Sequence, residues 1–287
     1  MDIFSILSQT IVFLFASPNL ASSPVPIGTG FIIQYPITED KSRFIPLIVT
    51  SKHVVGDYKK VFARFNSSSG SQTAVVEYDL EQQKKTNDFW VHSDDGVDIC
   101  VFRTMSYSQT KYEALPLDLI AKRDEFLAND IKQTDRVVYP GLLVNFMGQQ
   151  NNYPIMKEGS IALIPNEKVP LQYMVGSKKI QTQQEIIFLN SISVPGLSGS
   201  PVFLWPGPRL VKNAFTVGGT KPLFLGVMHG FYNALPREVE KVETTESKWF
   251  YRDNSGIALV FPSWKLREIL EQDNFLKRIG ELKAQIK

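Results

Sequence analysis

Residues 193–203 read Ser-Val-Pro-Gly-Leu-Ser-Gly-Ser-Pro-Val-Phe, a short polar turn set between apolar stretches of the chain. Gly196 and Gly199 flank Ser198 and allow the backbone to turn sharply, which exposes amide N–H groups near the serine hydroxyl. A hydroxyl and two N–H donors directed at one point are a nucleophile and an oxyanion hole. Turns of this composition are also common connectors, so the stretch predicts chemistry only together with other residues.

The composition is that of an ordinary globular protein. The 287 residues are 43% hydrophobic and 21% charged, enough for a core in one large domain or two small ones. A formal net charge of +2 gives no electrostatic reason to expect nucleic acid or a membrane surface as partner. Cys100, the single cysteine, excludes an intramolecular disulfide, and we expect it to be a buried core residue. The three histidines show no metal-ligand spacing, so we expect no metal and no cofactor.

The first residues form an apolar run that resembles a secretory signal in length. Asp2 stands where a signal peptide carries positive charge, and polar residues at 8–10 split the run. We therefore predict a short helix at residues 2–8 and a strand at residues 10–16. A chain without disulfides and with a poor signal sequence favours a cytoplasmic location over a secreted or periplasmic one.

Short runs rich in Val, Ile, Phe and Tyr recur through most of the chain, and Gly, Pro, Asn and Ser separate them. This pattern is typical of an antiparallel β-sandwich or barrel and not of βαβ units. The predicted strands are 10–16, 30–34, 47–50, 60–65, 74–80, 99–103, 136–139, 160–164, 185–191, 201–204, 223–229 and 257–260.

Two segments break the β pattern and divide the chain. Residues 111–131 carry charges and a proline, and we interpret them as a link between two β lobes. After Ser263, a plausible N-cap, apolar residues recur at helical spacing. We therefore predict an N-terminal lobe at residues 1–125, a C-terminal lobe at residues 126–262 and a terminal helix at residues 263–287.

Two further stretches carry side chains suited to catalysis. Residues 47–55 read Leu-Ile-Val-Thr-Ser-Lys-His-Val-Val, so His53 follows a turn at the end of a predicted strand. Most histidines are surface or capping residues, and this alternative stays open for His53 alone. Residues 94–102 read Asp-Asp-Gly-Val-Asp-Ile-Cys-Val-Phe, so Asp98 enters an apolar strand. A buried carboxylate is costly unless it is paired, and an imidazole N–H is a natural partner. Without one, Asp98 is an ordinary strand-entry aspartate.

The order His53, Asp98, Ser198 resembles that of the trypsin-like serine peptidases of chymotrypsin fold. The chain is most similar to bacterial members of the kind that includes the HtrA proteases, without an appended PDZ domain. Residues 28–33, Gly-Thr-Gly-Phe-Ile-Ile, resemble the strand that opens the first barrel. Residues 225–230, Leu-Gly-Val-Met-His-Gly, resemble the substrate-binding strand. The resemblance implies an all-β fold of two six-stranded antiparallel β-barrels with a C-terminal helix.

The resemblance also implies a serine endopeptidase that acts on protein or peptide substrates. Ser198 would be the nucleophile, His53 the general base and Asp98 the group that orients His53. The amides of Gly196 and Ser198 would form the oxyanion hole. No nucleic acid, membrane, metal or cofactor is implied, and the oligomeric state stays open.

Three residues bear on substrate binding by the same resemblance. Ile192 would lie at the base of the specificity pocket, where its lack of charge disfavours Lys or Arg. Gly230 lies in the substrate-binding strand. His229 would either read a substrate side chain, as in glutamate- and glutamine-specific relatives, or be buried beside the triad. Leu197 replaces the aspartate that pairs with a new N-terminus in zymogen-type members. We therefore expect no activation by N-terminal trimming, and uncleaved protein that gains activity only on trimming would contradict this.

Two other functions remain open at the level of sequence. The first is a latent or catalytically silent chymotrypsin-fold module that binds or regulates, since a fold does not fix a function. The second is an esterase-like acyl hydrolase, but its Gly-x-Ser-x-Gly motif is absent because Ser200 occupies the last position.

Overall fold

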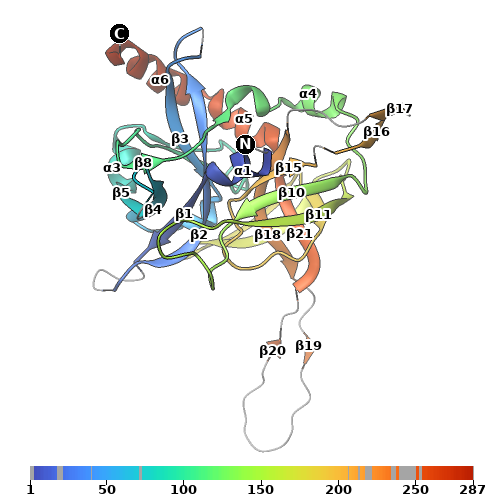
Figure 1. The fold of residues 1–287 in the computed structure, drawn as a ribbon. Helices are drawn as coiled ribbons and strands as arrows, with labels where there is room; N and C mark the ends of the chain where they lie inside the picture. The colour runs from blue at the N-terminus through green and yellow to red at the C-terminus, as the bar shows by residue number, and fades with distance from the viewer. Residues whose placement is uncertain are drawn as a thin grey trace, which may run out of the picture.

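The computed structural model describes residues 3–17, 22–39, 41–70, 73–205, 207–212, 214–216, 222–233, 237–238, 250–251 and 254–286. Two β lobes lie side by side, the N-terminal lobe in blue and cyan and the C-terminal lobe in green to orange (Figure 1). The two C-terminal helices lie along one side of the molecule, and helix α1 (Ile3–Gln9) lies near its middle (Figure 1).

The first lobe is a nine-stranded sheet with the order β5-β4-β1-β2-β3-β7-β6, to which β8 and β9 add at β4 and β2. All its pairings are antiparallel except that of β2 with β9. Its strands are β1 (Ile11–Ala16), β2 (Val25–Pro36), β3 (Phe44–Thr50), β4 (Lys60–Ser67), β5 (Thr73–Asp79), β6 (Phe89–Val91), β7 (Cys100–Arg103), β8 (Thr110–Lys111) and β9 (Leu115–Pro116).

The second lobe is a closed barrel with the order β10-β11-β14-β21-β18-β15. Its strands are β10 (Arg136–Gly141), β11 (Ile155–Leu163), β14 (Ile187–Asn190), β15 (Pro201–Leu204), β18 (Leu223–Asn233) and β21 (Asn254–Pro262). Three two-stranded ribbons extend from it: β12 (Val169–Val175) with β13 (Lys178–Gln184), β16 (Arg209–Val211) with β17 (Ala214–Thr216), and β19 (Arg237–Glu238) with β20 (Phe250–Tyr251).

The predicted all-β fold of chymotrypsin type is confirmed. Each strand expected from the apolar runs coincides with an observed strand, and the N-terminal helix and strand lie where the sequence places them. The first lobe differs from the predicted six-stranded barrel in its number of strands. Helix α3 (Leu80–Lys85) lies between β5 and β6, the two ends of the main strand path, and contacts both.

The expected terminal helix is divided into α5 (Ser263–Leu270) and α6 (Asp273–Ile286). The break has a packing reason. Leu266, Ile269 and Leu270 follow helical spacing, but the next buried apolar residue, Phe275, comes five residues later. The interruption at residues 271–272 brings the Phe275 ring against Trp90, with centroids 4.8 Å apart.

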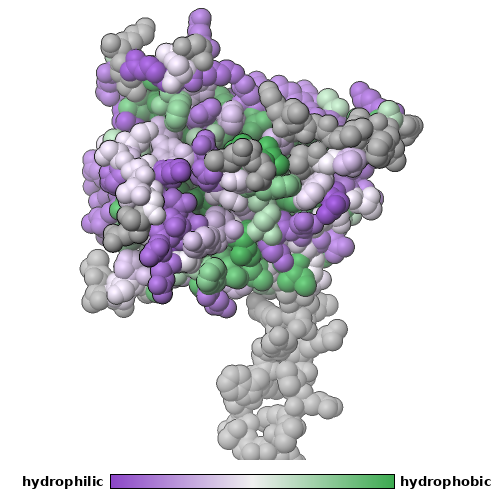
Figure 2. All heavy atoms as spheres, in the orientation of Figure 1, coloured by the Kyte–Doolittle hydropathy of each residue, from purple (hydrophilic) through white to green (hydrophobic). Residues whose placement is uncertain are grey.

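The segment predicted as a link between the lobes, residues 111–131, begins at the end of β8 and consists of short elements joined by loops. It includes β9, a 3₁₀ turn at Leu117–Leu119 and helix α4 (Arg123–Ala128). A large core cluster joins the lobes and the C-terminal helices, with Phe31 of β2 against Phe224 of β18 at 5.7 Å. In the space-filling view, hydrophilic residues cover most of the outer parts of one face, and hydrophobic residues gather towards its middle (Figure 2). Among the helices in the described part of the chain, none combines the length and apolar character needed to cross a bilayer.

Candidate active site

Ser198 is the second residue of the second of two consecutive tight turns. Leu197 N donates to Val194 O at 3.2 Å, and Ser200 N donates to Leu197 O at 3.0 Å. The third residue of each turn is a glycine with positive φ, +102° at Gly196 and +87° at Gly199. Proline followed by glycine with positive φ is typical of a type II turn, so Pro195-Gly196 explains the first turn from sequence alone.

The loop that carries Ser198 packs directly on the first lobe. Thr29 N, in the first lobe, donates to Ser198 O at 2.9 Å. Gly199 N donates to Met228 O of β18, in the second lobe, at 2.8 Å. A Cβ at Gly199 would lie 2.1 Å from Thr29 O and 2.3 Å from Thr50 Oγ1. Glycine is therefore required at position 199 by contact as well as by conformation.

Thr29 of β2 also fixes the peptide group between Gly196 and Leu197 in this loop. Its Oγ1 donates to Gly196 O at 2.6 Å and accepts from Leu142 N at 2.9 Å. The side chain is fully buried, so these bonds replace water for every group involved. Among the described hydrogen bonds, the amides of Gly196 and Ser198 donate none, which leaves both N–H groups available to a ligand oxygen.

His53 and Asp98 are paired by two hydrogen bonds. His53 is the second residue of the short helix α2 (Lys52–Val55), and its backbone N donates to Asp98 Oδ1 at 2.8 Å. Its ring Nδ1 lies 2.5 Å from Asp98 Oδ2. Asp98 is fully buried and the His53 side chain is 25% exposed. The imidazole therefore has one nitrogen on the carboxylate, and part of the ring remains open to solvent.

His229 is the second imidazole on the same carboxylate. Its Nδ1 lies 2.5 Å from Asp98 Oδ2, and its ring is 5.3 Å from that of His53. The structure thus places His229 beside the expected triad, which matches the second of the two alternatives from sequence. Ser198 Oγ donates to the backbone carbonyl of His229 at 3.0 Å and not to His53.

The charges of this cluster shift two pKa values. Burial alone would raise the pKa of Asp98, but attraction to His53 and His229 and hydrogen bonds from both rings outweigh it and hold the pKa below its usual value. Burial opposes protonation of His53, yet the adjacent Asp98 carboxylate raises the His53 pKa above 6.5. Both shifts favour an ionised carboxylate beside an imidazole that accepts a proton near neutral pH.

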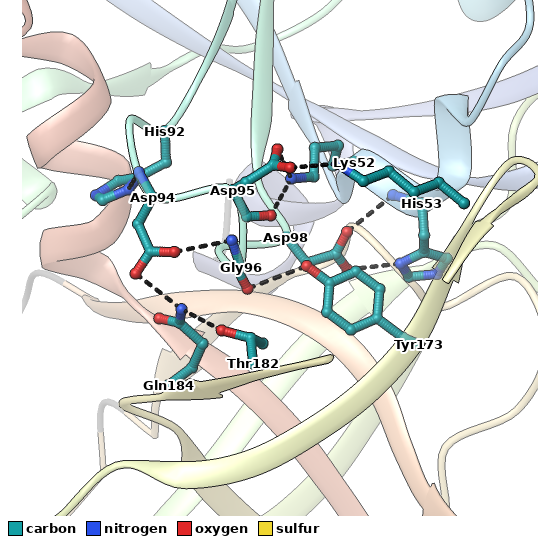
Figure 3. A network of polar contacts seen from close by, with 11 residues as sticks. Lys52, His53, His92, Asp94, Asp95, Gly96, Asp98, Tyr173, Thr182 and Gln184 are labelled. Carbon is teal, nitrogen blue, oxygen red and sulfur yellow. Dashed lines mark hydrogen bonds and ion pairs between the residues drawn. The ribbon is translucent and has the colours of Figure 1, made fainter. Parts of the chain in front are cut away.

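A hairpin of the second lobe covers the segment that leads to Asp98 (Figure 3). Tyr173 of β12 donates its hydroxyl to Gly96 O at 3.0 Å, and Gln184 of β13 donates to Asp94 Oδ2 at 2.9 Å. A Cβ at Gly96 would lie 2.0 Å from Thr182 Oγ1, so the two segments are in close contact. The Asp98 segment is therefore held from both lobes.

The other expected site residues lie as follows. Gly230 is next to the nucleophile, since a Cβ there would lie 3.9 Å from Ser198 Oγ. Ile192 is 59% exposed, and its part in substrate binding stays a prediction. Cys100 is fully buried in β7, and burial raises the pKa of its thiol, which disfavours a thiolate nucleophile.

His53, Asp98 and His229 are also residue types that bind metal ions, and they offer ligand atoms within 4.8 Å of one another. Bonds of about 2.0 Å in a tetrahedral zinc site would place neighbouring ligand atoms roughly 3.3 Å apart. The two Nδ1–Oδ2 separations of 2.5 Å are hydrogen-bond lengths. The residues as arranged therefore fit a hydrogen-bonded cluster and not an ion, and no metal enters the mechanism below.

Sequence reasoning missed the role of three contacts. Thr29 was part of a recognised strand motif, but its side chain carried no separate signal. Tyr173 and Gln184 lie in a ribbon that was not predicted, because its second strand reads Lys-Lys-Ile-Gln-Thr-Gln-Gln and is largely polar. The two residues between these strands, Gly176 and Ser177, form a hairpin connection that could have signalled the ribbon.

An antiparallel barrel, a nine-stranded β lobe beside it, a Ser-Gly turn and a His–Asp pair with a buried carboxylate define the class of chymotrypsin-fold peptidases. Residues 28–211 match the model of the trypsin-like peptidase domain, so the chain belongs to that family. No curated protein sequence matches the chain.

Three solved structures are similar to this chain. The MamO protease domain from Magnetospirillum magneticum, in its apo form, is 10% identical, with 94% of this chain and 100% of that chain covered and a TM-score of 0.51. The HtrA-type protease AlgW with a decapeptide is 12% identical, covering 93% and 66%, with a TM-score of 0.48. The thermostable serine protease AL20 from an extremophilic microorganism is 12% identical, covering 91% and 95%, with a TM-score of 0.46. At 10% identity the similarity to the MamO domain shows the fold alone.

Proposed function

We propose that this chain is a serine endopeptidase that hydrolyses peptide bonds through Ser198, His53 and Asp98. The observation that carries the proposal is the pairing of His53 with the buried Asp98, which is made twice, through the ring and through the backbone. A surface histidine has no need of a fully buried carboxylate partner. Membership in the trypsin-like peptidase family supports protein or peptide substrates.

In the proposed reaction, Ser198 Oγ attacks the carbonyl carbon of the scissile bond while His53 takes the hydroxyl proton. The N–H groups of Gly196 and Ser198 stabilise the oxyanion, each at roughly 3 kcal/mol of barrier. The tetrahedral intermediate then breaks its C–N bond, and His53 gives the proton to the departing amine. Water then attacks the carbonyl carbon of the resulting ester while His53 takes its proton. The bond between that carbon and Ser198 Oγ breaks, and His53 gives the proton back to Ser198 Oγ.

The proposal requires the serine hydroxyl to change its hydrogen-bond partner. In the structure Ser198 Oγ donates to His229 O at 3.0 Å. A serine hydroxyl moves between staggered positions about its single χ1 torsion, so the proposal requires a change of χ1 rotamer that turns Oγ towards His53. We expect bound substrate to favour the rotamer that points Oγ towards His53, because attack on the scissile carbonyl requires Oγ, His53 and the carbonyl carbon to be aligned.

A second function is favoured by that same hydrogen bond. With Ser198 Oγ held on a backbone carbonyl, the chain would be a latent or catalytically silent module that binds or regulates. The two functions differ in whether the hydroxyl of the isolated protein reacts with an electrophile.

The test is a fluorophosphonate probe on the wild-type chain and on Ser198→Ala. An active peptidase forms a bond from Ser198 Oγ to phosphorus with release of fluoride, so we expect labelling of the wild type and none of the variant. We also expect Ser198→Ala to lose about six orders of magnitude in kcat on a peptide substrate. Folded wild-type protein that takes up no label would overturn the peptidase and support the silent module.

A further inference from the structure

Strand β18 carries a β-bulge at the active site. Met228 pairs with Val260 of β21, and Gly230 pairs with Leu259, so His229 is an extra residue without a partner in β21. A bulge of this kind redirects a side chain and frees backbone groups from the ladder, and bulges are common beside active sites. Here the bulge redirects the imidazole ring of His229 and leaves its carbonyl oxygen outside the pairing with β21.

Both groups of His229 contact residues of the proposed mechanism. Its Nδ1 lies 2.5 Å from Asp98 Oδ2, and its carbonyl accepts the Ser198 hydroxyl at 3.0 Å. The neighbouring residue Met228 accepts from Gly199 N at 2.8 Å and from Ser51 Oγ at 2.9 Å. The bulge therefore lies between the nucleophile loop and the His–Asp pair and contacts each of them.

The His229 ring has little freedom to turn away. It packs edge to face against Tyr173 at 4.8 Å, Phe261 at 5.6 Å and His53 at 5.3 Å. The residue is 9% exposed. Rings on three sides fix the direction of Nδ1, so its contact with the carboxylate is built into the packing.

The Asp98 carboxylate depends on His229 for its orientation. Oδ1 accepts from His53 N, and Oδ2 is shared by two Nδ1 atoms. A fully buried carboxylate that loses a donor carries an uncompensated desolvation cost and is free to rotate toward other donors. We propose that His229 is a positioning residue that fixes Asp98, and through it the ring of His53, for the reaction proposed above; this inference rests on that proposed function.

The contact also argues against the alternative role of His229 as a reader of substrate. A neutral imidazole with its proton on Nδ1, donated to Asp98, has a bare Nε2 that accepts but does not donate. A substrate carbonyl needs a donor. The tautomer that serves Asp98 is therefore the wrong one for recognising a Glu or Gln side chain.

The test compares two substitutions of nearly equal size. His229→Asn keeps an N–H donor near the position of Nδ1, whereas His229→Leu has the same branching and no donor. With a fluorogenic peptide, we expect His229→Leu to lower kcat by roughly 10- to 100-fold, the range for a hydrogen bond to a charged group, with little change in KM. His229→Asn should lose about tenfold less than His229→Leu.

A second readout is independent of activity. In the full chain with Ser198→Ala, the Nδ1–H proton of His53 should give a downfield NMR signal that His229→Asn retains and His229→Leu loses. An unchanged signal in His229→Leu, or an equal loss in both variants, would overturn the proposal, because the hydrogen bond would then not be the cause. If the wild type proves inactive, the proposed function fails while this measurement still decides the positioning role.

If His229→Leu does not fold, the wild-type chain provides the deciding measurement. Nitrogen-15 NMR of His229 should show the Nδ1–H tautomer. A proton on Nε2 with a bare Nδ1 would mean that His229 donates nothing to Asp98 and would overturn the proposal.

Discussion

Thr29 Oγ1 donates a hydrogen bond of 2.6 Å to the carbonyl oxygen of Gly196, 167 residues further along the chain. This bond fixes the peptide group that follows the proposed oxyanion-hole amide of Gly196. Because Thr29 N also holds Ser198 O at 2.9 Å, one residue of the first lobe orients two peptide groups of the nucleophile loop.

Thr29→Val tests this relationship, since valine matches threonine in shape and lacks the hydroxyl. It leaves Gly196 O and Leu142 N without their buried partner, at a cost of about 2 kcal/mol in unfolding free energy. We expect kcat to fall by about tenfold or more with KM nearly unchanged, because the oxyanion hole acts in the transition state. Thr29→Ser keeps the hydroxyl and serves as the control; a kcat equal to that of Thr29→Val would contradict the prediction.

The pH dependence of activity should follow His53. Asp98 raises the pKa of His53 above 6.5, and only neutral His53 accepts the serine proton. We therefore expect kcat/KM to fall as pH drops, with the midpoint of the acidic limb above 6.5. A pH–rate profile of the full chain measures this midpoint, and a value clearly below 6.5 would be inconsistent with an intact His53–Asp98 pair.

Stability should depend on pH in the opposite sense at the same residue. A raised pKa in the folded state means that His53 stabilises the fold fully below pH 6.5 and ceases to do so as pH rises through the folded-state pKa. For Asp98, whose pKa is lowered, the contribution is present above pH 3.8 and lost as pH falls. Melting temperatures across this range, compared with Asp98→Asn, should show a maximum that the variant lacks.

Two glycine substitutions should have opposite effects. Gly199→Ala places a Cβ 2.1 Å from Thr29 O at a φ of +87°, and we expect a loss of about 2 kcal/mol or more together with lost labelling of Ser198. Gly280→Ala in α6 meets nothing within 4 Å and should stabilise the helix by about 0.5–1 kcal/mol. Denaturant unfolding measures both; a Gly199→Ala variant as stable as wild type would argue against the described loop conformation.

Cleavage preference provides a further check. Ile192 carries no charge at the position expected to lie at the base of the specificity pocket, so we predict preference for an apolar or small residue over Lys or Arg. A peptide series with Arg, Leu, Val or Gln before the scissile bond measures this through kcat/KM. Clear preference for Arg would remove Ile192 from this role.

The strands could be predicted because each has a local signal, whereas the pairing of His53 with Asp98 was predicted from the resemblance to trypsin-like peptidases. Alternating apolar runs between turn residues marked the strands, and a carboxylate that enters an apolar strand, as Asp98 does, requires a partner. Ser198 was marked by its glycines. These signals depend only on residues close together in the chain, so a single sequence is enough to recognise them.

The rest depended on distances between segments far apart in sequence. The Thr29 bond to Gly196 and the His229 bond to Asp98 arise from how the lobes meet. The Thr29 side chain had no signal in the sequence, and for His229 the sequence left two alternatives open. The position of α3 between β5 and β6, the two ends of the main strand path in the lobe that is not a closed barrel, is likewise a contact between elements.

The β12–β13 hairpin reaches the first lobe through three aspartates. Ser177 donates to Asp57 at 2.7 Å, Gln184 to Asp94 at 2.9 Å and Lys178 to Asp95 at 2.6 Å. Of these three contacts, the one between Lys178 and Asp95 joins two exposed charges, so dissolved ions screen it. At this edge of the molecule, higher ionic strength would therefore weaken that ion pair, while the hydrogen bonds from Ser177 and Gln184 and the buried aromatic contacts elsewhere would change little.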